Sequence, residues 1–250
     1  MTPRFALLLL ATGLMLTAGP SAIAGAATCE APESAIETAG VLPVVAAARR
    51  AGGPLRVTVV GSASTGGAGT SGPGKSYTAK LAAALSRRLG IEVGVEAHGR
   101  RGWTARAMAE EMPDIVAADQ PHLVIWQTGT VDAVREVAPE AFGQALVQGS
   151  EALKQGGVDL LLMDMQYSAI SVRLIDYGPY LDHMNWAAAA FGNPVFHRHA
   201  VMRAWAEESR FGDPGRRKAD QESYADQVHA CMAELLAQVI TDIQAESAPR

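Results

Sequence analysis

Short apolar runs that alternate with amphipathic stretches constrain the fold of this chain more than any other feature of its sequence. Five runs read as buried strands, and the stretches between them space apolar residues as one face of a helix does. Strands separated by helices predict a doubly wound three-layer α/β/α sandwich around a five-stranded parallel sheet. The expected strands are Leu55–Val60, Ile91–Ala97, Leu123–Trp126, Val158–Met163 and Pro194–Phe196. The expected helices are Ser76–Leu89, Thr104–Ala118, Pro139–Gln155, Val172–Phe191 (interrupted at Gly178-Pro179), Ala200–Glu208 and Ser223–Ala245.

The carboxyl ends of the predicted strands are where a functional site is expected, because open α/β sheets bind ligands in the crevice outside those ends. The loops after Val60, Ala97 and Trp126 are therefore the main candidates. The last helix contributes to such a site if it returns to the same edge of the sheet.

The first residues have the pattern of a secretory signal peptide. Arg4 precedes the apolar run Phe5–Leu16, and small residues with A-x-A cleavage sites follow around Ala24. The run is shorter than the roughly 20 residues that a membrane-spanning helix needs. We therefore expect residues 1–26 to be removed on export and residues 27–250 to form a single domain with no stable membrane span. The expected location is periplasmic or secreted.

Charge and cysteine content exclude some classes of function and predict one cross-link. The net charge of −5 comes without a basic stripe, so we expect no nucleic acid partner. In an oxidising compartment, Cys29 and Cys231 are expected to form a disulfide between the N-terminal segment and the last helix. Two unpaired buried thiols are the alternative. No second cysteine pair or histidine pair at ligand spacing accompanies them, so we expect no metal site.

One segment matches a phosphate-binding pattern. Gly69–Ser76 satisfies G-x-x-x-x-G-K-[ST], and the apolar run ending at Asp164 resembles the strand that usually accompanies it. A true P-loop needs its first glycine almost directly after a strand, whereas here that glycine, Gly69, comes nine positions after Val60. A solvated lysine in a glycine-rich loop explains the match equally well, so nucleotide binding is a remote alternative.

A D-x-x-H pair near the C-terminus points to a different chemistry. Asp226 and His229 lie three positions apart within YADQVHACM, so they can share one local surface. A carboxylate that binds the Nδ1 hydrogen of an imidazole fixes its tautomer and lets Nε2 act as a general base toward a serine. Taken alone the pair is weak evidence, because exposed Asp and His residues occur at this spacing by chance.

Four short segments follow one another in a recognisable order. They are GSASTGG at Gly61–Gly67, GRRGWT at Gly99–Thr104, GTVD at Gly129–Asp132, and the D-x-x-H of Asp226 and His229. Together they resemble the blocks of the SGNH/GDSL hydrolase family over Leu55–Ala237. The resemblance implies a flavodoxin-like fold and esterase, lipase or deacetylase activity on a small-molecule, carbohydrate or lipid ester. It implies no metal or organic cofactor.

The nucleophile position departs from the family pattern. Aligned on Gly61 and Thr65, Ala63 takes the place of the family's serine nucleophile. Ser64 is the nearest replacement and Ser62 is the alternative, on a turn that glycines make adaptable.

The predicted oxyanion site has a gap as well. Gly102 resembles the family's glycine whose backbone N–H binds the oxyanion, with Gly99 as the alternative. Val131 stands where the family has a donating asparagine, and the hydroxyl of Thr130 is the nearest substitute.

The sequence thus predicts an exported ester hydrolase in which Ser64 is the nucleophile, His229 the base and Asp226 its orienting group. The alternative is an SGNH-fold binding or accessory protein without turnover, because two of the four residues that name the family are absent.

Other polar residues also follow the predicted strands. His98, Arg100 and Arg101 come after the second strand, where they either contact an anionic substrate or belong to a solvated loop. Gln166 and Tyr167 come after the fourth strand, at the mouth of the expected cleft.

Overall fold

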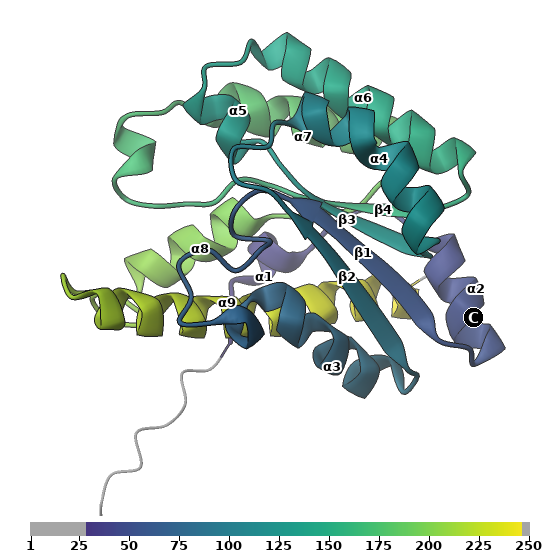
Figure 1. Ribbon diagram of the computed structural model, residues 1–250, viewed down its shortest axis with the longest axis horizontal. Coiled ribbons are helices and arrows are strands. Elements are labelled where there is room, and N and C mark those ends of the chain that lie inside the picture. The colour runs from purple at the N-terminus through teal and green to yellow at the C-terminus, as the bar shows by residue number, and fades with distance from the viewer. Residues whose placement is uncertain (1–28, 247–250) are drawn as a thin grey trace, which may run out of the picture.

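The computed structural model of the chain describes residues 29–246 (Figure 1). The predicted signal peptide, residues 1–26, lies outside the described residues. None of the helices in the described part is long and apolar enough to cross a membrane.

A parallel sheet forms the middle layer. Its strands are β1 (Leu55–Gly61), β2 (Val93–Gly99), β3 (Leu123–Gln127), β4 (Asp159–Met163) and β5 (Val195–Phe196). They lie in the order β2-β1-β3-β4-β5, and every neighbouring pair is parallel. This is the flavodoxin-like order, in which the chain reverses direction across the sheet between β1 and β3. The predicted five-stranded sheet is confirmed, although β2 begins at Val93 rather than at Ile91.

Helices cover both faces of the sheet. They are α1 (Glu33–Ile36), α2 (Pro43–Ala51), α3 (Tyr77–Leu89), α4 (Ala105–Asp119), α5 (Thr130–Val134), α6 (Pro139–Gln155), α7 (Gly178–Phe191), α8 (Arg198–Glu207) and α9 (Lys218–Glu246). Figure 1 shows α4, α5, α6 and α7 in one layer, with α1, α3, α8 and α9 on the opposite side of the sheet. The predicted three-layer α/β/α sandwich is therefore confirmed.

The two hydrophobic cores follow from the two-residue period of a strand. Along β3, Leu123 and Ile125 pack into the core beneath α3 and α9, whereas Val124 and Trp126 pack into the core beneath α4 and α6. Successive side chains of a strand point to opposite faces, so a strand buried on both sides reads as one continuous apolar run. That run is the signal from which the strand was predicted.

The chain between β4 and α7 differs from the expectation. A helix was predicted over Val172–Phe191, but the structure has a 3-10 turn at Ser171–Arg173, then loop, and α7 begins at Gly178. Pro179 lies in the first turn of α7, where its missing N–H costs no helical hydrogen bond. The proline therefore starts the helix instead of interrupting it.

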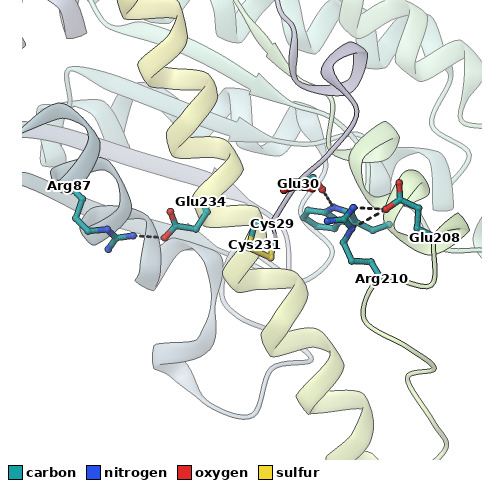
Figure 2. Close-up of a disulfide and its surroundings, with 8 residues drawn as sticks. Cys29, Glu30, Arg87, Glu208, Arg210, Cys231 and Glu234 are labelled. Carbon is teal, nitrogen blue, oxygen red and sulfur yellow. Dashed lines mark hydrogen bonds and ion pairs between the residues drawn. A yellow bond between two sulfur atoms is a disulfide. The ribbon is translucent and has the colours of Figure 1, made fainter. Parts of the chain in front are cut away.

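A disulfide between Cys29 and Cys231 ties the N-terminal segment to α9, as predicted (Figure 2). The bond joins residues that are 202 positions apart in the sequence. Next to it, the indole Nε1 of Trp205 on α8 donates a hydrogen bond of 2.7 Å to the Glu30 carbonyl oxygen. The N-terminal segment is thus held against both α8 and α9.

Removing this disulfide is expected to lower the free energy of unfolding. Closing so long a loop restricts the unfolded chain, which the chain-entropy model values at about 5 kcal/mol as an upper bound. Urea unfolding of a Cys29→Ser/Cys231→Ser variant should show the loss, and reductant should produce a similar loss in the parent protein but none in the variant. A parent protein whose midpoint does not respond to reductant would contradict this expectation.

Candidate active site

A pocket of about 300 Å³ opens at the carboxyl edge of the sheet. Its lining comes from the loops that follow β1, β2 and β3, together with Gln166 after β4. The pocket therefore lies where the strand order reverses between β1 and β3, the position at which such sheets bind ligands. The loops that the sequence singled out after Val60, Ala97 and Trp126 contribute to it.

The turn after β1 is tight, and its consecutive residues Ser62, Ala63 and Ser64 line the pocket. A Cβ on Gly61 would lie 2.2 Å from the Thr65 hydroxyl oxygen, so the chain turns back on itself there only because the residue is glycine. The Thr65 amide donates to the Ser62 carbonyl oxygen, over 3.2 Å, and closes the turn. As a result Ala63 is partly exposed in the pocket, whereas Ser62 and Ser64 are mostly buried in its floor.

The side-chain amide of Gln127, at the end of β3, is the centre of a hydroxyl network. Its Oε1 accepts hydrogen bonds from Ser64, at 2.9 Å, and from Thr65, at 2.7 Å. Its Nε2 lies 3.3 Å from the Ser62 hydroxyl oxygen and donates to it. The Ser64 hydrogen is thus directed to a neutral amide, which orients the hydroxyl but cannot take its proton. Before Ser64 can act as a nucleophile, it has to exchange this hydrogen bond for one to a base.

His229 is a buried residue of α9 and accepts a hydrogen bond at Nδ1 from the backbone N–H of Tyr77, over 3.0 Å. Tyr77 begins α3, and the first N–H groups of a helix have no partner within it. Burial lowers the pKa of His229 to about 4, and the Arg198 guanidinium acts in the same direction. The ring is therefore neutral at pH 7, and because Nδ1 accepts, its hydrogen is on Nε2.

Asp226 lies one helical turn before His229 but contacts a different partner. Its carboxylate accepts from the backbone N–H of Ser71, at 2.9 Å, and from the Ser71 hydroxyl, at 2.6 Å. Within residues 29–246 no hydrogen bond joins Asp226 to His229, or His229 to Ser64. The predicted chain of Ser64, His229 and Asp226 is thus not assembled in this structure, because each side chain has a different partner, on β3, at the start of α3 and in the loop between β1 and α3 respectively.

The predicted oxyanion residues do meet in the pocket. Gly102 and Thr130 both line it, as does Val131. Gly102 has φ +76°, and a Cβ there would lie 2.7 Å from Nη2 of Arg135, so the guanidinium packs directly against its backbone. The Thr130 hydroxyl oxygen accepts from the Gln166 backbone N–H at 2.9 Å, which leaves its own hydrogen for another acceptor.

Asp132, the last residue of the GTVD segment, stabilises the fold by binding the start of α4. Both carboxylate oxygens of Asp132 accept from the backbone N–H of Ala105, at 3.0 and 3.1 Å, at the start of α4. Burial raises the pKa of Asp132, while this hydrogen bond and the Arg135 charge oppose the rise. Asp132 therefore fastens α5 to the N-terminus of α4, next to the pocket but not in its lining.

The phosphate-loop pattern has a structural explanation. The hydroxyl of Ser76 accepts from the Ala79 amide at 3.1 Å and is the N-cap of α3. Lys75 is exposed, and Asp164 accepts from the backbone N–H of His199 at 2.7 Å. The two residues that would hold a metal, Ser76 and Asp164, are thus engaged in local structure, whereas Lys75 is exposed to solvent.

Three residues that the sequence interpretation missed stand out. Gln127 directly follows an apolar run at a carboxyl end, which was a readable signal. Arg135 comes one helical turn after Val131, so it can face the same side of α5. Arg198 is buried and donates from Nη2 to Oε1 of Gln166 over 3.2 Å, a contact for which the sequence holds no signal.

The fold and the pocket together define an α/β protein of the SGNH/GDSL hydrolase type, and the resemblance found in the sequence is confirmed. The chain belongs to the non-GDSL lipase-like family, whose model matches residues 28–246. No curated protein sequence matches the chain significantly.

Several solved structures, esterases among them, share the fold. TesA superposes with a TM-score of 0.55 at 20% identity, over 72% of this chain and 99% of its own. AlinE4, an SGNH-hydrolase family esterase, gives 0.56 at 23% identity, over 66% and 85%. A two-domain esterase (CEX) active on acetylated mannans gives 0.68 at 14% identity, over 88% of this chain and 59% of its own.

Changing His229 tests its observed role in holding α3. His229→Leu leaves the Tyr77 N–H without an acceptor and should cost about 1–3 kcal/mol of unfolding free energy at pH 7. His229→Asn keeps an acceptor and should cost less. Because the pKa of His229 is lowered from 6.5 to about 4, the unfolded state binds more protons between these values. The parent protein therefore loses stability as the pH falls through that window.

Urea unfolding at pH 7.0, 5.5 and 4.5 measures both effects. The difference in unfolding free energy between the parent protein and His229→Asn should shrink as the pH falls, since asparagine does not titrate. A constant difference across the three pH values would mean that His229 titrates normally in the folded protein.

Proposed function

We propose that the chain is an exported ester hydrolase that acts in the pocket at the carboxyl edge of the sheet. The observation that carries the proposal is the meeting of Ser64, Gly102 and Thr130 around one pocket in a member of a lipase-like family. Esterases with the same fold support it, and one of them acts on acetylated mannans. The substrate is then an ester of a small molecule, a carbohydrate or a lipid.

In the proposed reaction the Ser64 hydroxyl oxygen attacks the acyl carbon while a base takes its proton. The alcohol leaves with that proton, and water then hydrolyses the acyl-serine to release the acid and regenerate Ser64. The Gly102 amide and the Thr130 hydroxyl donate to the oxyanion. His229 is the proposed base, with Asp226 as its orienting group.

This mechanism requires a rearrangement on α9. His229 must release the Tyr77 amide and carry its hydrogen on Nδ1, so that Nε2 can accept from Ser64. Asp226 must exchange its hydrogen bonds with Ser71 for one with His229.

A second candidate function is ligand binding without turnover. Ala63, rather than a serine, is the partly exposed residue of the turn, and Ser64 and His229 are both engaged by other partners. An SGNH-fold accessory protein would use the same pocket to hold an ester or its product.

The disulfide supports export. Disulfides persist in oxidising compartments such as the periplasm and the cell exterior, and Cys29–Cys231 joins two distant parts of the chain. The predicted signal peptide and the periplasmic or secreted location belong to the same proposal.

Hydrolysis of p-nitrophenyl acetate and butyrate tests the two candidates. Ser64→Ala should reduce kcat by at least about 10³-fold, because no other group forms the acyl intermediate. Ser223→Ala, an exposed serine on α9, is the matched control and should retain full activity. A loss in Ser62→Ala but not in Ser64→Ala would move the nucleophile to Ser62. Absence of turnover on every ester would favour the binding protein.

A further inference from the structure

Two arginines line the pocket without an acidic partner. Arg101 follows β2 and Arg135 follows α5, and no Asp or Glu belongs to the lining of this pocket. Within residues 29–246 neither guanidinium makes a hydrogen bond or an ion pair. Two nearby arginines, by contrast, are paired with glutamates. Arg100 binds both carboxylate oxygens of Glu111, and Arg106 pairs with a glutamate one turn away on α4. Within the described residues, the two arginines that line the pocket thus lack the ion pair that their neighbours have.

Arg135 is placed by the backbone against which it packs. Its Nη2 approaches Gly102 so closely that any side chain there would collide with it. The buried carboxylate of Asp132 attracts this guanidinium electrostatically, but no hydrogen bond or ion pair joins the two within residues 29–246, and both Asp132 oxygens accept from Ala105. The guanidinium therefore lies at the pocket wall beside Gly102, and no hydrogen bond or ion pair within residues 29–246 uses its donors.

A third cation lies behind the pocket. Arg198 is 3% exposed, and its Nε and Nη1 have no hydrogen-bond partner within residues 29–246. Its Nη2 holds Oε1 of Gln166, which leaves the Nε2 hydrogens of that lining residue as donors. The nearby Asp164 is already engaged by the backbone of His199. Asp164 offsets part of its charge electrostatically, but with two donors unpaired the buried guanidinium still adds positive potential at the pocket, since little water screens it.

We propose that this pocket binds a carboxylate between Arg101 and Arg135, so that its natural ligand is a small organic acid or an acidic sugar. A planar guanidinium binds a carboxylate with two parallel hydrogen bonds. The cavity of about 300 Å³ is the size of a small-molecule site. Where the pocket also hydrolyses esters, a step that rests on the proposed function, the preferred ester carries a carboxylate on the part that Arg101 and Arg135 bind.

Matched ester pairs test the preference. 4-Acetoxybenzoate and 4-acetoxybenzamide share the acyl group and the scissile bond, and they differ in charge. The anionic ester should have about a 10-fold higher kcat/KM, through a lower KM, and NaCl should reduce the preference. Arg135→Gln should bring the ratio of kcat/KM between the anionic and the neutral ester, both measured in that variant, down to about one. Arg106→Gln removes an equal charge away from the pocket and should change neither ester.

Direct binding separates this inference from the proposed function. Isothermal titration calorimetry of the full chain with 4-hydroxybenzoate against 4-hydroxybenzamide, and with glucuronate against glucose, needs no turnover. Tighter binding of either acid, weakened at least 10-fold in Arg135→Gln and unchanged in Arg106→Gln, supports the carboxylate site even if no ester is hydrolysed. Equal hydrolysis of both esters with no acid preference overturns the site and leaves the hydrolase standing. Absence of both binding and turnover overturns the carboxylate site as well as the hydrolase.

Discussion

The parallel pairing of β1 with β3 is the constraint on which the rest of this structure depends. The register sets Val60 beside Trp126, so that Gly61 and Gln127 end the two strands side by side. Gly61 has no side chain, which allows the backbone to approach Gln127 closely and the next residues to turn back. The Gln127 amide then holds the turn through three hydroxyl groups. Pocket, turn and hydroxyl network all follow from this one junction.

The helices that complete the site are held by polar contacts that serve the fold first. His229 accepts from the N-terminus of α3, and Asp132 accepts from the N-terminus of α4. Buried N–H groups at helix ends need such partners, and leaving them unpaired costs free energy. Side chains that look catalytic in the sequence are therefore already occupied. In this chain, side chains that the family pattern assigns to the active site bind helix N-termini instead.

Much of the fold could be predicted from the sequence, because strand burial leaves a local signal. The apolar run of β3 and the helix of α6, with its bounds Pro139–Gln155, were both readable. The short helix α5 was missed, since Thr130–Val134 is too brief to show a helical period. The start of α7 was missed because Pro179 can either interrupt a helix or begin one.

For the site, the sequence by itself determined which residues follow the central strands, and so brought Ser64, Gly102 and Thr130 to one edge. It also limited a disulfide within the chain to one pair, Cys29 and Cys231, and the structure decided that the two thiols are bonded. Only the tertiary structure decided which hydrogen bonds those side chains make. A three-residue spacing places Asp226 and His229 on one helix face. Their hydrogen-bond partners, Ser71 and the backbone of Tyr77, come from a distant part of the chain that packs against that face. Hydrogen-bond partners depend on segments far apart in the sequence, and no local pattern records them.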